Sequence, residues 1–382
     1  MTSQSVARLA AGAFVAVGVC LVPLRLPAQA PAQAPGAAAP STARPAAPKP
    51  RPAGEKGAAR GWTVPRTPDG KPDLQGLWTN ATVTPLERPD GAKEFATAEE
   101  LAALEKRGNR DEQAKADAER GTPAASTETP AAPARRNGIG DYNAIWWELG
   151  KKALENSRSS IITGPSGKLP HTPETVQRLA ANREYERLHP ADGPEFRDNI
   201  ERCLAWITSG PPMLPTFYNN TYKIYQTPKT VAILVEMIHD VRLIHLDGSA
   251  HSSPAVRQWM GDSRGHWEGD TLVVETVNIN SKRGYIGGGG GRSGIAPNND
   301  KMKVTERFTR TAADTIMYQF TVENPGIYTG PWSGEIPMKA TDEPLYEYAC
   351  HEGNYAMHDI LSGARADEAA AAKGKEKKER EH

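Results

Sequence analysis

The sequence lacks several features that would place it in a large class of proteins. Its 382 residues contain no apolar run of the roughly 20 residues that a transmembrane helix needs, so we expect no membrane span in the mature protein. Lys plus Arg and Asp plus Glu both total 46, and the part expected to fold has no basic block. Nothing in the charge pattern therefore favours a nucleic-acid partner.

No segment carries a catalytic motif specific enough to name a reaction. The Gly-rich stretch 284–294 lacks the Gly-Lys-Ser/Thr of a phosphate loop. His245 and His251 flank a turn, but no third ligand accompanies them, so we expect no metal site. The sequence likewise predicts no cofactor.

The N-terminus has the three parts of a secretion signal. Arg8 precedes an apolar run from Leu9 to Val22, and small residues follow up to Ala30. We predict a signal peptide over residues 1–30, with cleavage between about Ala28 and Ala34 and a periplasmic or secreted mature protein.

The rest of the chain divides by composition. Residues 31–60 are mostly Ala and Pro and have almost nothing to bury, which predicts a disordered linker. Residues 61–364 are expected to form a single β-rich domain with a helical or irregular insertion at 94–205. Within the insertion, Thr172-Pro173-Glu174 is typical of a helix start. Residues 365–382 form a charged tail, either disordered or helical.

Period-two alternation predicts the core of this domain. Strands are expected in eight segments after the first at 74–84, namely 222–226, 230–237, 240–246, 271–279, 302–309, 316–323, 332–338 and 345–350. Short connections between consecutive strands favour an antiparallel meander of about nine strands, closed as a lipocalin-like barrel or stacked as a sandwich.

Two cysteines remain after the predicted signal peptide, Cys203 and Cys350. An even pair in an exported protein favours a disulfide over a metal site or a nucleophile. Two free buried thiols are the alternative.

Several motifs resemble a widespread, uncharacterised family of exported bacterial proteins. The resemblance is carried by GDSRGHWEGDTLVV at 261–274 and YACHEGNY at 348–355, and it continues at 72–78, 158–170, 210–220 and 236–242. It covers nearly everything from Trp62 to Arg365. It implies membership of that family, and no reaction or catalytic residues come with it.

Two polar segments are candidates for chemistry. The first is a loop at 262–270, and the second begins at Cys350, where the last expected strand ends. Their candidate acid/base residues are His351, Glu352, His266, Asp262 and Asp270. We expect the two segments to meet at one end of the β-domain and share a pocket. The alternatives are a salt-bridged loop and structural capping of the barrel end.

Further residues are expected to contact a ligand. They are Arg264, Trp267, Glu268, Tyr218, Asn220, His239, Arg242, Asn354 and Tyr355. These loops, rich in aromatic, Asn and Arg residues, favour an exported β-barrel domain that binds a small, partly apolar molecule. The alternatives are a periplasmic hydrolase or lyase acting on a carbohydrate-like substrate, and a structural or partner-binding protein.

Overall fold

The computed structural model describes residues 62–108, 150–189, 191–283 and 301–380. The predicted signal peptide, the whole linker, the middle of the insertion and the Gly-rich stretch lie outside these residues.

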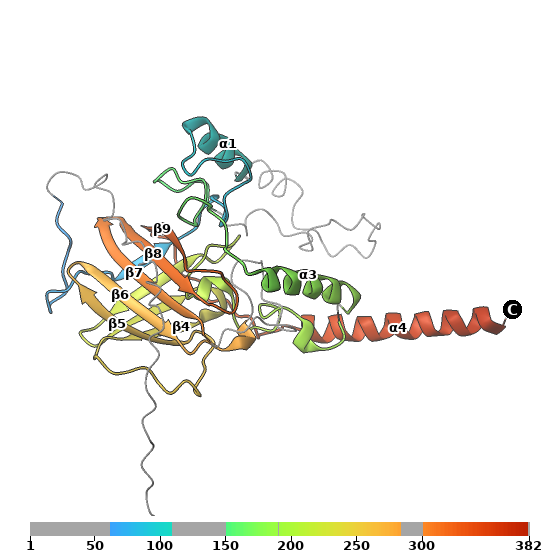
Figure 1. Cartoon of the computed structure of the whole chain (residues 1–382). Helices are drawn as coiled ribbons and strands as arrows, with labels where there is room; N and C mark the ends of the chain where they lie inside the picture. Colours follow the sequence, from blue (N-terminus) through green and yellow to red (C-terminus); the bar gives the residue numbers. More distant parts are fainter. Residues whose placement is uncertain (1–61, 109–149, 190, 284–300, 381–382) are drawn as a thin grey trace, which may run out of the picture. The chain divides into compact units, whose positions relative to one another are not determined.

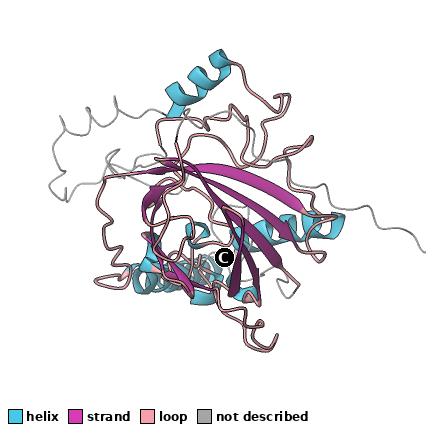
Figure 2. Ribbon diagram, turned by 90° about the vertical axis from the view of Figure 1, so that its left-hand side faces the viewer, coloured by secondary structure: helices cyan, strands magenta, loops and turns pink. Residues whose placement is uncertain are grey.

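The strands form a closed barrel in which neighbours follow chain order (Figures 1 and 2). They are β1 (Gly76–Thr79), β2 (Thr221–Gln226), β3 (Thr230–Val235), β4 (Val241–His245), β5 (Asp262–Glu268), β6 (Thr271–Val277), β7 (Lys303–Ala312), β8 (Thr315–Glu323) and β9 (Trp332–Ala340). Pairing of β1 with β9 closes the barrel. The prediction of a mainly β barrel with a helical insertion is confirmed.

Alternation along the strands explains the closed core. In β8, for example, Ile316, Tyr318, Phe320 and Val322 are buried, and the residues between them are half-buried. Inward side chains of β1, β2 and β7 add Trp78, Tyr222 and Phe308, each at most 1 % exposed. These buried side chains make the barrel interior a packed core. Burial of each one stabilises the fold by roughly 1.5–3 kcal/mol.

The strand directions differ from the expected meander at one place. All neighbouring pairs are antiparallel except β4 and β5, which are parallel through Ile244–Ser263 and His245–Arg264. A parallel pair cannot be joined by a tight hairpin. The connection 246–261 therefore returns the chain to the end at which β4 begins.

Two segment assignments from the sequence are wrong. Residues 262–268 are strand β5 and not a loop, and only the turn at 269–270 remains of the expected polar loop. Residues 345–350 do not form a strand, and the last strand of the barrel is β9, which ends at Ala340. The expected number of strands is right because these two errors cancel.

The strand directions define two ends of the barrel. The hairpin end contains the turns at 227–229, 269–270 and 313–314. At the opposite end β2, β4 and β5 begin and β3 and β6 end. There the plug, residues 206–216, packs into the core with Met213 and Leu214 fully buried. We call this the plugged end.

The described residues include three α-helices outside the barrel strands (Figure 2). They are α1 (Ala98–Gly108), α3 (Pro173–Leu188) and α4 (Ala356–Arg380). The predicted start of α3 is confirmed, since the Thr172 side chain accepts a hydrogen bond from the amide of Thr175. Helix α4 begins before the predicted charged tail and runs through most of it.

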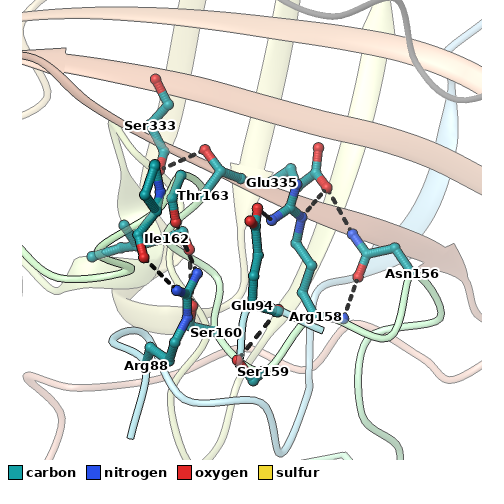
Figure 3. A network of polar contacts seen from close by, with 12 residues as sticks. Arg88, Glu94, Asn156, Arg158, Ser159, Ser160, Ile162, Thr163, Ser333 and Glu335 are labelled. Atoms are coloured by element: carbon teal, nitrogen blue, oxygen red, sulfur yellow. Dashed lines mark hydrogen bonds and ion pairs between the residues drawn. The ribbon is translucent and has the colours of Figure 1, made fainter. Parts of the chain in front are cut away.

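A polar network fastens the insertion to the outer face of β9 (Figure 3). Arg158 donates to Glu94 (2.8 Å) and to Glu335 of β9 (2.6 Å), and Asn156 also donates to Glu335 (2.8 Å). Arg88 is buried and donates to the carbonyls of Gly164 and Pro165. The contacts of Arg158 and Asn156 thus tie the insertion to strand β9.

Candidate functional site

A tyrosine inside the barrel holds the plug through a hydrogen bond. The amide of Met213 donates to Tyr318 Oη (2.8 Å), and the Met213 carbonyl accepts from Asn80 (3.2 Å). Tyr318 Oη donates in turn to Glu306 Oε1 (2.7 Å). Burial and the nearby Glu306 charge raise the pKa of Tyr318 well above its ordinary value, so the phenol keeps its proton.

Glu306 forms a buried ion pair with Arg242. Nη1 of Arg242 donates to Glu306 Oε1 (2.8 Å), and Nη2 contacts Glu306 Oε2. The remaining donors of Arg242 reach Ser263 Oγ (3.1 Å) and Thr276 Oγ1 (2.8 Å). The two charged side chains are 2 % and 0 % exposed. Arg242 is therefore part of the barrel interior and does not line a binding surface, contrary to its expected ligand-binding role.

A strap, residues 341–350, carries the chain from the end of β9 back to the plugged end. It begins beside β1, where the Thr341 amide donates to the Leu77 carbonyl (3.1 Å). It ends at the predicted disulfide, which is confirmed: Cys203 and Cys350 are bonded, with Cα atoms 5.7 Å apart. The disulfide fixes the strap to the segment that leads into the plug.

Four aromatic side chains form a continuous row at this end. Trp206 meets Phe217 edge-on (6.4 Å between ring centroids), Phe217 meets Tyr218 edge-on (4.7 Å), and Tyr218 stacks with Tyr348 of the strap (6.4 Å). These are favourable geometries for ring pairs. Trp206 is buried, whereas the other three rings are half-buried. The aromatic row therefore keeps part of its surface in contact with solvent.

Glu236, directly after β3, contacts residues that flank two rings of the aromatic row. Its side chain accepts hydrogen bonds from Thr221, from the backbone of Tyr346 and from the side chain of Asn219, so it contacts the direct neighbours of Tyr218 and the strap. The residue is 6 % exposed. Burial raises the pKa of its carboxyl group, and these hydrogen bonds offset the effect only in part.

The corner that follows Glu236 has an unusual backbone. Ile238 adopts φ 61°, a left-handed conformation that a β-branched residue rarely takes. Asp240 then accepts a hydrogen bond from Ser209 of the plug (3.1 Å). The corner between β3 and β4 is thus tied to the plug.

The predicted residues at 351–355 lie beside the disulfide. His351, Glu352 and Tyr355 are exposed, and Asn354 contacts Cys203 Sγ (3.4 Å). Among the described residues, no hydrogen bond or ion pair joins this segment to residues 262–270.

The residues predicted along 262–270 are spread over the length of the barrel. Asp262 begins β5 at the plugged end, and Asp270 pairs with Arg66 (2.7 Å) at the hairpin end. His266 and Glu268 lie on the outer wall, where Glu268 also pairs with Arg307 (2.9 Å). Trp267 points inward and packs against the core. The structure divides a set that the sequence grouped together.

Asp262 has a histidine partner that the sequence did not pair with it. Its Oδ2 contacts His251 Nδ1 (3.1 Å) and accepts from the amide of Ser252 (2.7 Å), while Oδ1 pairs with Arg264 (3.0 Å). Burial alone would raise the pKa of Asp262, but these partners together hold it below its ordinary value. The other ring nitrogen of His251 faces Glu275 (3.4 Å). The histidine is therefore bracketed by two carboxylates on the outer wall.

The remaining predicted ligand residues have other positions. Tyr218 belongs to the aromatic row. Asn220 is fully buried and exchanges two hydrogen bonds with the backbone of Thr216 (2.7 and 2.9 Å), which shapes the exit from the plug. His239 lies in the short turn Met237–His239.

The sequence analysis did not select four of the site residues: Glu236, Trp206, Phe217 and Tyr348. A single acid at the end of the apolar run 230–237 was a signal for Glu236, since an isolated carboxylate is costly to bury. Tyr348 offered no such signal, because its neighbours in the row come from a segment about 130 residues away in the sequence.

Among the described residues, none of the helices is long and apolar enough to span a membrane, and no cluster of His, Cys, Asp and Glu is arranged to hold a metal ion. Comparisons with models of protein families, with curated proteins and with solved structures find no match to this chain.

Proposed function

We propose that the domain binds a small, partly apolar molecule at its plugged end. The observation that carries this proposal is the half-buried aromatic row beside the buried carboxyl group of Glu236. Ligand sites combine apolar and aromatic surface with a few fixed polar groups. The packed interior supports a site at the barrel end over a lipocalin-type central cavity.

The proposal is tested by a thermal-shift screen against sugars, lipids and aromatic metabolites, followed by calorimetry on any ligand found. Tyr218→Ala and Tyr348→Ala are expected to weaken binding by about tenfold or more, because each removes a ring that stacks on the ligand. The control is Tyr225→Ala, which removes a ring that is 46 % exposed on the outer wall of β2. Equal binding by all three variants would reject the plugged end as the site.

We also propose that the mature protein is exported. Support comes from the predicted signal peptide and from the disulfide, a bond that persists in oxidising compartments. N-terminal sequencing of periplasmic material should find a mature start between about Ala28 and Ala34. An intact Met1 in that material would end this proposal.

A further inference from the structure

The buried carboxylate of Glu236 has no cation among its contacts. Its partners are Thr221, Asn219 and the backbone of Tyr346, all of them uncharged donors, and no Lys or Arg side chain of the described residues contacts it. A buried carboxylate normally has a positive partner, because neutral hydrogen bonds do not replace the hydration of a full charge.

The lysine or arginine closest in sequence does not supply that charge. Arg242 follows on β4, but its guanidinium is saturated inside the barrel by Glu306, Ser263 and Thr276. Its charge is already balanced by the Glu306 carboxylate. Among the described side chains, no Lys or Arg therefore balances a negative charge on Glu236.

A second observation that favours a cation is the aromatic surface near Glu236. Tyr218 precedes Asn219, which contacts Glu236, and it stacks with Tyr348, two residues after the Tyr346 amide that donates to the same carboxylate. Tyr346 itself is 68 % exposed. The faces of aromatic rings carry negative potential and attract organic cations, most strongly where water is excluded.

We propose that the ligand of this site is a small organic cation, a quaternary ammonium or protonated amine with an apolar body. This inference rests on the proposed binding function and names the class of its ligand. The cation supplies a positive partner for the Glu236 carboxylate. Its methyl or methylene groups pack on the rings of Tyr218 and Tyr348.

Choline and its neutral isostere 3,3-dimethylbutan-1-ol form the matched probe pair, because they differ in the charge and hardly in shape. Calorimetry on the full mature chain should show choline binding at least about tenfold more tightly than the alcohol. The Glu236→Gln variant keeps the shape of the side chain and an acceptor oxygen. Its affinity for choline should be about tenfold lower, while its affinity for the alcohol should be unchanged.

A second pair of variants keeps the test decisive if Glu236→Gln does not fold. Tyr218→Phe retains the aromatic face and should retain choline binding, whereas Tyr218→Leu should lose it, and Tyr225→Leu serves as the control away from the site. Failure of choline to bind the wild-type protein, or equal affinity for both probes, overturns the cationic class. If a neutral ligand from the screen then binds in a Tyr218-dependent manner, the proposed function stands and only the ligand class is rejected.

Discussion

The two ends of the barrel hold their polar groups in opposite ways. At the hairpin end, Arg66 pairs with Asp270 and Lys339 with Asp314, and all four side chains are a third or more exposed. In the interior beneath the plug and at the plugged end, the Arg242–Glu306 pair, Tyr318 and Glu236 are buried. Exposed pairs contribute little to stability, whereas buried polar groups are costly unless fully partnered. The difference predicts that substitutions of the buried groups cost more stability than substitutions at the hairpin end.

The largest expected difference between the ends concerns the two ion pairs. Glu306→Leu leaves Arg242 charged and buried without a partner and should lower the free energy of unfolding by about 3–5 kcal/mol. The matched change at the hairpin end, Asp270→Ala, should cost at most about 1 kcal/mol. Urea denaturation of both variants checks this. Comparable losses would mean that burial does not distinguish the two ends.

Removal of the disulfide should have the next largest effect. The bond joins residues separated by 147 positions, so it restricts the unfolded chain strongly. Cys203→Ser/Cys350→Ser should lose about 2–5 kcal/mol of unfolding free energy. Denaturation of the wild type with and without reductant gives an independent value, and a loss well below 1 kcal/mol by both routes would contradict the prediction.

Tyr318→Phe should have an intermediate effect. It removes the acceptor of the Met213 amide and a donor to Glu306, leaving a buried amide unpaired at a cost of about 1–3 kcal/mol. Amide hydrogen exchange should then speed up in the plug and not at the hairpin turns. Uniform acceleration at both ends would show that the tyrosine does not hold the plug specifically.

The smallest effect is a pH dependence from Asp262. Its folded-state pKa is lowered, so the stability that it contributes is complete above the ordinary value of 3.8 and is lost as the pH falls through the folded-state pKa. Asp262→Asn should remove this part of the acid destabilisation. Unfolding free energies measured from pH 6 downward check it, and superimposable curves for the variant and the wild type would contradict it.

The sequence predicts those parts of the fold in which local signals agree with tertiary packing. Strands β7 and β8 alternate clearly, and α3 has its capping threonine and proline at the expected positions. The cysteine pair needed only an even count and an exported context. In these cases the information lies within a few residues.

Strand β5 was missed because only one of its inward side chains is large and apolar. Ser263 faces Arg242 inside the barrel. Gly265 has to be small, since a Cβ there would lie 2.8 Å from atoms of Ile244 and Leu246. Only Trp267 is both inward and apolar, so the strand reads as a polar loop. Its partners on β4 and β6 cannot be inferred from local pattern.

The candidate site was predicted only in part for a related reason. Tyr218 and the disulfide were selected, but Arg242 was assigned to a ligand because its partner Glu306 lies 64 residues further along the chain. The strap, by contrast, has the alternation of a strand yet lies outside the barrel. Long-range pairing decides both outcomes, and residue pattern alone does not contain it.

The most direct test of the claim that the plugged end is the functional end is a hydrogen-exchange map with and without a bound ligand. With choline, or with any ligand found by the screen, protection should concentrate in residues 206–220, 236–240 and 346–350. The hairpin turns at 227–229, 269–270 and 313–314 should not change. Protection confined to those turns, or to the outer wall of β2–β4, would contradict the account.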